Sequence, residues 1–466
     1  MTPARLTLAT LPCNRAIVQP ITSGNRHPMR LSGFASLIAF TAASVLLAGC
    51  AGFTTSGSPA APSQISLAGI HGTVFGGQQP IVGATIQLYQ AGTTGYGQGA
   101  TALIANGGVL TLAGGVFNIS GLYTCAPGSQ VYITSSGGNP GGGTNANATL
   151  IAGLGLCDNA PNIPFITLDE VTTVGTVWAL APFMNGLNIG APPSNQSGLV
   201  SAFADINTLV TIVQGGSPGP AAPAGSTVPV QEIYALADSL GACVNSTGAG
   251  GGGFCDTLFS YTTPSGGTAP ADTVSAAINI ARYPTQNAAN ILKLATPSPP
   301  FATTFKSAND LTLAVTYTGS GLSAPTAAAV DASGNVWITN SGNNSVTELS
   351  HAGAPQSGAG FTAGALNVPS AIAIDTVGNA WIANSGNSTL TELTSSGTNA
   401  TNSPFSGGGL STPTSVAIDG MGNVWLSNSG NNSASEFSSA GTTLSGSTGY
   451  LATGLATPIG LAVNPH

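Results

Sequence analysis

Apolar and polar residues follow one pattern three times in the last third of the chain. The copies begin at Pro325, Pro369 and Pro413, and the first reads PTAAAVDASGNVWITNSGNNSVTELS. In each copy, three short runs alternate small or apolar residues with polar ones, which is the period of a β-strand with one buried face. A D-x-x-G segment separates the first two runs and a Ser-Gly-Asn segment the last two, and these residues favour tight turns. Each copy is therefore predicted to form a small antiparallel sheet.

The three copies keep a constant spacing of 44 residues. Three residue types mark this spacing: Trp337, Trp381, Trp425; Asp331, Asp375, Asp419; and Glu348, Glu392, Glu436. Short strands that recur every ~40–50 residues predict the blades of a β-propeller. One such sheet cannot bury both of its faces, so neighbouring copies are expected to stack with one Trp between each pair of sheets. The Asp side chains are expected to cap the turns rather than to act as nucleophiles.

The repeated core P-x-x-x-A-x-D-x-x-G-N-x-W, followed by N-x-G-N, resembles the NHL and streptogramin-lyase-like propeller families. The resemblance covers residues 301–466 and implies a propeller there. These families include both enzymes and docking platforms, so the resemblance leaves the activity open. For the lyases it implies a His, acidic residues and a metal gathered near the propeller axis.

The array of repeats is short for a closed propeller. Residues 313–321 resemble the outer strand of a preceding blade, and a fourth copy begins at Pro458. This makes about three blades and a strand at each end, whereas propellers close with about 4–8 blades. The expectation is either that further copies follow His466 or that two chains associate to complete the ring.

The N-terminal region has the pattern of an export signal. A basic segment and an apolar run end in the sequence LAGC at Cys50, which resembles the lipobox of bacterial lipoproteins. This implies a signal peptide at 1–49 and lipidation of Cys50. Residues 1–28 are expected to be either a mis-called start, with translation from Met29, or an atypical extension of the signal. A transmembrane anchor is the less favoured alternative because the apolar run is short. The expected location is the outer membrane or cell surface, with residues 50–65 as a flexible tether to the lipid anchor.

The charge of the chain excludes one class of partner. The whole chain has 7 basic and 15 acidic residues, and most of the basic ones lie in the predicted signal. The mature part keeps Arg282, Lys293 and Lys306 against all fifteen acids. Nucleic acid is excluded as a partner because nothing neutralises phosphate charge.

Four cysteines remain after the export signal: Cys125, Cys157, Cys243, Cys255. An even number in an exported chain predicts disulfides, and three pairings are conceivable. The local pairs Cys125–Cys157 and Cys243–Cys255 are favoured. No CxxC motif or His pair accompanies these cysteines, which argues against a zinc site.

Two further domains are expected before the repeats. Residues 66–165 alternate like strands, and G-x-V-x-G-x-x-P-I-x-G-A resembles the carboxypeptidase-regulatory-like, transthyretin-like β-sandwich, which implies a spacer or adhesion module. Residues 166–300 change to helical spacing and predict four or five helices, with Thr167 and Glu170 forming a capping box and the GAGGGG loop a flexible linker. The predicted fold is multidomain and mainly β: sandwich, helical middle and a partial propeller at 301–466.

The repeats offer little for catalysis. Their two histidines are His351, in a predicted turn at the blade edge, and the terminal His466. Each blade is expected to place only one carboxylate near each turn, which is too few for calcium. The sequence therefore predicts no catalytic residue, no metal site and no cofactor. It favours a non-catalytic binding or scaffold module for an extracellular protein or glycan; the alternative is a streptogramin-lyase-like or lactonase-like propeller enzyme.

Overall fold

The computed structural model describes residues 6–9, 65–66, 69–121, 123–295 and 299–463. The predicted lipidation site Cys50 and nearly all of the predicted signal and tether lie outside these residues. The exception in the signal is β1 (Leu6–Ala9), which pairs with β16 (Ala314–Tyr317). No helix within the described ranges has the length and hydropathy needed to cross a membrane.

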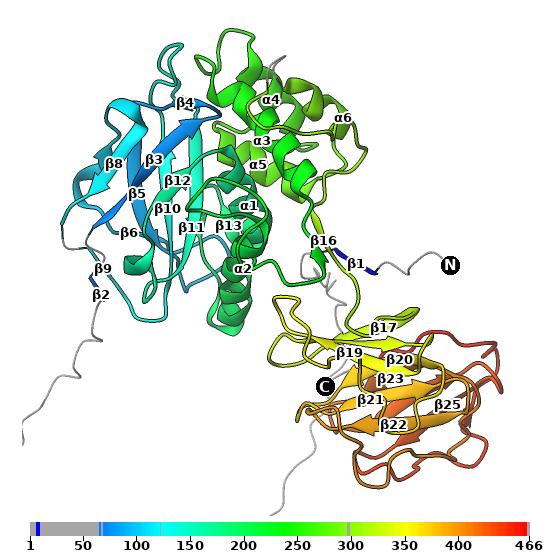
Figure 1. Cartoon of the computed structure of the whole chain (residues 1–466). Helices are drawn as coiled ribbons and strands as arrows, with labels where there is room; N and C mark the ends of the chain where they lie inside the picture. The colour runs from blue at the N-terminus through cyan, green and yellow to red at the C-terminus, as the bar shows by residue number, and fades with distance from the viewer. Residues whose placement is uncertain (1–5, 10–64, 67–68, 122, 296–298, 464–466) are drawn as a thin grey trace, which may run out of the picture. The chain divides into compact units, whose positions relative to one another are not determined.

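The first half of the chain forms two main sheets (Figure 1). Alternating buried residues of β3, Ile70, Val74 and Gly76 among them, turn one face of that strand into the core. The strands of the larger sheet are β11 (Thr149–Leu156), β10 (Gln130–Ser136), β5 (Thr85–Gln90), β6 (Thr101–Ala102) and β7 (Val109–Leu110). Those of the smaller sheet are β12 (Ile166–Leu168), β3 (Ile70–Gly76), β4 (Gln79–Pro80) and β8 (Val116–Ile119). Short two-stranded pairs are β2 (Ile65–Ser66) with β9 (Thr124–Cys125), and β13 (Met184–Asn185) with β14 (Asn188–Ile189).

The α-helices of the described chain all lie between Glu170 and Ile291. They are α1 (Glu170–Leu180), α2 (Gln196–Leu209), α3 (Val230–Val244), α4 (Phe254–Thr262), α5 (Thr273–Arg282) and the single turn α6 (Ala288–Ile291). Short 3-10 turns are Ala105–Gly107, Ala113–Gly115, Ala160–Asn162, Ala181–Phe183, Pro193–Asn195 and Leu292–Leu294. The short strand β15 (Ser226–Thr227) lies between α2 and α3 and pairs with β16.

The N-cap of helix α1 lies two residues later than the sequence predicted. The capping residue is Asp169, whose carboxylate accepts a 2.7 Å hydrogen bond from the N–H of Thr172. Thr167 instead belongs to β12, which runs parallel to β3. The capping box expected from Thr167 and Glu170 is therefore wrong, because pairing with β3 keeps Thr167 extended and leaves the cap to the first residue after the strand.

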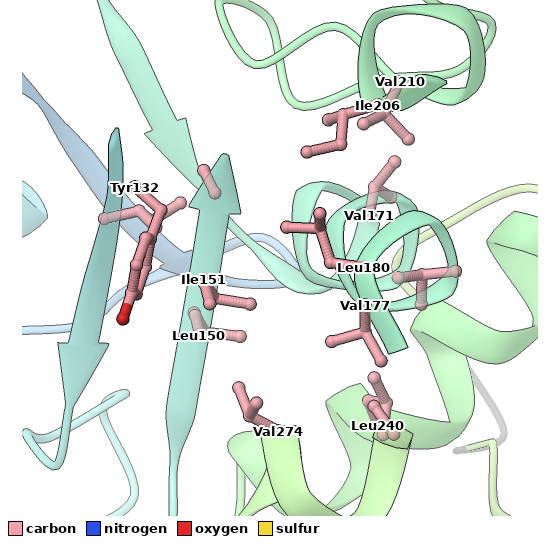
Figure 2. Close-up of a cluster of buried hydrophobic side chains, with 14 of the residues drawn as sticks. Tyr132, Leu150, Ile151, Val171, Val177, Leu180, Ile206, Val210, Leu240 and Val274 are labelled. Carbon is pink, nitrogen blue, oxygen red and sulfur yellow. The ribbon is translucent and has the colours of Figure 1, made fainter. Parts of the chain in front are cut away.

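Helix α1 covers the free edge of the larger sheet. Two N–H groups of β11, those of Ile151 and Gly153, donate to the hydroxyls of Thr173 and Thr176, each at 3.1 Å. A covered edge strand has no unpaired groups to offer another chain. Figure 2 shows Leu150 and Ile151 of β11 pointing toward Val177 of α1, whereas Val171 lies on the side of that helix nearer Val210.

Sheets and helices share one hydrophobic core. The cluster of buried apolar residues extends without a break from Ile70 to Leu313. Every residue of α1 except Trp178 and Ala179 is buried, as expected for a helix surrounded by other elements. The boundary expected between 66–165 and 166–300 therefore falls inside this common core.

The repeats form three consecutive antiparallel sheets, here called blades 1, 2 and 3. Blade 1 consists of β17 (Pro325–Val330), β18 (Val336–Asn340) and β19 (Ser345–Leu349). Blade 2 consists of β20 (Pro369–Ile374), β21 (Ala380–Asn384) and β22 (Thr389–Leu393). Blade 3 consists of β23 (Pro413–Ile418), β24 (Val424–Asn428), β25 (Ser433–Phe437) and the outer strand β26 (Tyr450–Leu451). The described residues do not close a ring.

In blades 1 and 2, a single bridging residue stands in the place of an outer strand. Phe361 bridges to Val346 and Phe405 bridges to Leu390, at the places where β26 pairs in blade 3. The expected outer strand before blade 1 is present as β16, but β16 pairs with β15 and β1 rather than with strands of a preceding blade.

Candidate functional site

A carboxylate organises the first turn of every blade. In blade 1, Oδ1 of Asp331 accepts the backbone N–H of Ser333 at 2.8 Å and that of Asn335 at 2.9 Å. Its Oδ2 accepts the indole Nε1–H of Trp337 at 3.2 Å. The same Trp–Asp bond measures 3.1 Å in blade 2 and 3.0 Å in blade 3. These Asp oxygens hold the turn and the indole, and so are not free for chemistry.

A second carboxylate lies beside the first. Nδ2 of Asn335 donates to Oδ2 of Asp331 at 3.1 Å and to Oε1 of Glu348 at 3.0 Å. The expectation of one carboxylate per turn is therefore wrong. Glu348 is distant in sequence but stands opposite Trp337 in the pairing of β18 with β19, and its recurrence every 44 residues was the available signal.

Burial and mutual repulsion affect these glutamates. Desolvation raises the pKa of Glu348, and the charge of Asp331 raises it further. Glu392 of blade 2 is in the same situation, since desolvation and the charge of Asp375 raise its pKa. Each pair thus holds one acid that resists ionisation beside an Asp used for structure.

The remaining candidates for catalysis do not converge. His351 is exposed in the turn after β19, and His466 lies outside the described residues. Within the described parts of the chain, no group of three or more His, Cys, Asp or Glu side chains could hold a metal ion.

A second polar site lies where β3, β4 and α1 meet. A pocket of about 290 Å³ is lined by Thr73, Phe75, Gly77, Gln78, Thr167, Asp169, Gln214, Gly215 and Phe301. Asp169 is 5% exposed, and burial raises its pKa to about 7. The carboxylate of Glu170 points into the protein and accepts the N–H of Gly77 at 2.9 and 3.1 Å. Glu170 thereby ties α1 to the β3–β4 turn.

Three acids are buried in this region. Glu170 has no exposed surface, and burial raises its pKa to about 8. Asp238 of α3 is 1% exposed, and burial raises its pKa to about 6 although the charge of Lys306 lowers it. Oδ1 of Asp238 accepts the N–H of Phe301 at 3.0 Å, whereas its Oδ2 has no partner. Burial thus shifts these acids toward the protonated state, so their contribution to the stability of the folded state is larger at low pH.

Both disulfides expected from the sequence are present. Cys125 and Cys157 are joined across a Cα–Cα distance of 6.2 Å, and Cys243 and Cys255 across 4.4 Å. The second bond links the end of α3 to the start of α4.

The glycine-rich loop between α3 and α4 is organised by a carboxylate. Asp256 accepts four consecutive backbone N–H groups, those of Gly250, Gly251, Gly252 and Gly253. These bonds, that to Gly250 first, lower the pKa of Asp256. The predicted flexible linker is therefore wrong, since the backbone forms a nest of the kind that binds anions and the chain supplies the anion itself.

Comparison with known proteins finds partial matches to solved structures only. No family model and no curated protein matches the chain. Among solved structures, a streptogramin B lyase is 20% identical with a TM-score of 0.21, over 26% of this chain and 39% of that one. A catalytically inactive virginiamycin B lyase from Staphylococcus aureus, solved with quinupristin, is 14% identical with a TM-score of 0.24, over 28% and 43%. A protein of unknown function from Bacteroides caccae is 18% identical with a TM-score of 0.21, over 26% and 44%.

These matches are partial on both sides, because the chain spans less than half of each of these three structures. Streptogramin-lyase-like propeller proteins are thus structural neighbours at low TM-score. The likeness is too small to transfer any activity, and the class that this chain shows is a mainly β protein with propeller-like blades.

Proposed function

We propose that this protein is an exported, lipid-anchored binding or scaffold protein that uses its propeller blades as a non-catalytic interaction surface. The proposal rests on the structural role of the repeated Asp residues. Asp331, Asp375 and Asp419 each hold a turn and an indole, so the residues that recur most regularly serve the architecture of the blade. A surface that is repeated for structural reasons suits recognition of an extended ligand more than a single reaction centre.

The export part of the proposal rests on the sequence and the disulfides. The LAGC motif at Cys50 supports lipidation, and the two disulfides are compatible with an oxidising compartment. The low charge of the chain, with 5% charged residues, suits recognition through hydrogen bonds to a glycan or an extracellular protein rather than through ion pairs.

A direct experiment compares binding with turnover. The mature chain is applied to arrays of glycans and extracellular-matrix peptides, and in parallel is incubated with a streptogramin B antibiotic and with simple lactones, with and without added Mg²⁺. We expect saturable binding to at least one array class and no substrate loss. Metal-dependent turnover that disappears in His351→Ala would overturn the proposal and support the propeller-enzyme alternative. Asp310→Ala, at an exposed position outside the blades, is the matched control for either readout.

A further inference from the structure

The pocket between β3, β4 and α1 is built on one face of β3. Burial alternates along this strand, so that Val74 is buried whereas Thr73 and Phe75 on either side of it are partly exposed. Thr167 of β12 stands opposite Thr73 in the parallel pairing of the two strands, which lie side by side (Figure 1). The two threonines and Phe75 therefore line the pocket together.

Asp169 brings a free acceptor to this pocket. Its Oδ1 accepts the N–H of Thr172 at 2.7 Å and caps α1, whereas its Oδ2 has no hydrogen-bond partner among the described residues. The side chain is 5% exposed, and a buried acceptor without a partner is costly unless a water molecule or a ligand pairs with it. Gly215 has a φ of +66°, and a Cβ added there would collide with Oδ2. The absence of that Cβ leaves this oxygen open to the pocket.

The walls of the pocket are held in place by the surrounding elements. Thr167 Oγ1 donates to the carbonyl of Val213 at 3.0 Å and so fixes the segment that carries Gln214. The ring of Phe301 stacks on Tyr234 of α3, with ring centroids 5.9 Å apart and 18° between the ring planes. A pocket that is already ordered spends less free energy on ordering its side chains when a ligand binds.

The polar groups of the lining match hydroxyl groups better than charges. Gln78 and Gln214 are exposed, and each amide offers both donors and an acceptor. Burial raises the pKa of Asp169 to about 7, so near neutral pH this group can accept or donate a hydrogen bond. A ligand hydroxyl pairs with all of these groups because it also donates and accepts. A cation offers donors only, and an anion meets no basic side chain among the described residues of the lining.

The apolar groups and the size of the pocket favour a single ring. Phe75 and Phe301 present partly buried aromatic rings, whose negative faces attract the C–H bonds on one side of a sugar ring. The volume of about 290 Å³ is at the lower end of the range for small-molecule sites, ~300–1,000 Å³. The pocket is therefore suited to one ring of a saccharide rather than to an extended chain.

We propose that this pocket binds a single neutral pyranose unit, either as a free sugar or at the end of a glycan chain. Oδ2 of Asp169 pairs with one ring hydroxyl, and Thr73 and Gln214 pair with others. The apolar face of the ring packs on Phe75 and Phe301. The pocket lies in the first half of the chain and is separate from the blade surface proposed above, so either site can fail without the other.

The test uses the methyl glycosides of glucose, galactose, mannose and N-acetylglucosamine as probes of the mature chain. Saturation-transfer difference NMR detects binding, and calorimetric titration gives the affinity. We expect saturable binding of at least one glycoside at one site per chain, with increased hydrogen-exchange protection of residues 75–78 and 214–216. A disaccharide that ends in the same unit distinguishes the two sources: equal affinity indicates the end of a glycan chain, and weaker binding indicates a free sugar.

Three variants test the lining. Asp169→Asn keeps an oxygen that can cap α1 but presents an amide N–H₂ in place of Oδ2, and is expected to weaken binding at least tenfold. Thr73→Val and Gln214→Ala each remove one neutral hydrogen-bonding group and are expected to weaken binding about fivefold. Gln79→Ala, at an exposed neighbour of Gln78 outside the pocket lining, is the matched control and should leave affinity unchanged.

Three results would overturn the proposal. The first is that no glycoside binds to a chain whose circular dichroism and melting curve show that it is folded. The second is glycoside binding that is unchanged in both Asp169→Asn and Gln214→Ala, which would place the sugar elsewhere on the protein. The third is binding of tetramethylammonium, lost in Asp169→Asn, by a chain that binds no glycoside, since the pocket would then be a site for cations.

Discussion

The indole Nε1–H of Trp381 donates a 3.1 Å hydrogen bond to Oδ2 of Asp375, while Oδ1 of the same carboxylate accepts the backbone N–H groups of Val377 and Asn379. One side chain thus connects the tight turn of blade 2 to the residue that fills the space before blade 3. The recurrence of Asp and Trp at the same spacing follows from this connection, since the buried indole N–H would have no partner without the Asp.

Removal of this carboxylate should destabilise the blades according to how deeply the indole is buried. We expect Asp375→Ala to lower the free energy of unfolding by about 1–3 kcal/mol, because Trp381 is 1% exposed and its N–H would lose its partner. Asp419→Ala removes the same bond from Trp425, which water can reach, and should cost less. Urea unfolding followed by Trp fluorescence provides the measurement. Equal losses for both variants would show that the turn, and not the indole bond, determines the cost.

Stability should fall as pH rises from acid to alkaline. Burial raises the pKa of Asp238 to about 6, that of Asp169 to about 7 and that of Glu170 to about 8, above their values in an unfolded chain. The folded state therefore holds protons more tightly, and the stability from these groups is fully present below pH ~4 and is lost as pH rises through about 6–8. Denaturant unfolding at pH 5 and pH 9 should show the loss.

Glu170→Gln should reduce that loss, because the amide oxygen can still accept the N–H of Gly77 while the variant has no proton to release there. A pKa raised by one unit corresponds to ~1.4 kcal/mol, so the difference between variant and wild type should exceed 1 kcal/mol. Burial also raises the pKa of Asp205 to about 7, so part of the pH dependence should persist. Glu232→Gln, a partly exposed site on α3, is the control. An unchanged pH dependence in Glu170→Gln would contradict this assignment.

The two disulfides should contribute unequally. Cys125–Cys157 closes a sequence separation of 32 residues and Cys243–Cys255 one of 12. Since longer closed loops restrict the unfolded chain more, replacing the first pair with Ser should lower the free energy of unfolding by roughly 1 kcal/mol more than replacing the second. Non-reducing peptide mapping of the exported protein establishes that both bonds form. Crossed pairs, or four free thiols, would contradict the arrangement.

Lipidation should depend on one residue. Because Cys50 ends the LAGC motif, Cys50→Ala should abolish incorporation of a labelled fatty acid and leave the precursor uncleaved. Cys13→Ala, which removes a cysteine upstream of the motif, should label normally. Labelling that survives in Cys50→Ala would place the acyl group elsewhere.

The blades were predictable because their information is local. Alternation along three short runs, turn residues between them and a constant spacing of Trp and Asp all lie within one repeat, so the sequence alone indicates sheets that stack. The role of Asp331 as a turn cap could be predicted for the same reason. The proximity of Glu348 could not be predicted from its position relative to the turn, since only the register of β18 with β19 brings it to Asn335.

In the first half of the chain, long-range contacts override the local patterns. The alternation of 66–165 and the helical spacing of 166–300 each indicated the right type of element, but not that Thr173 and Thr176 would complete the edge of β11. Nor does the sequence indicate that Asp256 would organise the glycines before it, because a Gly-rich segment is also the usual composition of a linker.

The sequence by itself determined the strands, turns and period of the blades and the helical character of most of 166–300, and it favoured the local cysteine pairs, since each depends on residues that are close in the chain or on a repeated spacing. Only the tertiary structure decided which carboxylates are buried, which sheet edge is covered and which blade tryptophan is left partly open. Those properties depend on what a distant segment places against a side chain. The pKa of Glu170 and the burial of Trp425 are set by residues that lie far from them in the sequence. The local sequence around either residue does not specify those neighbours.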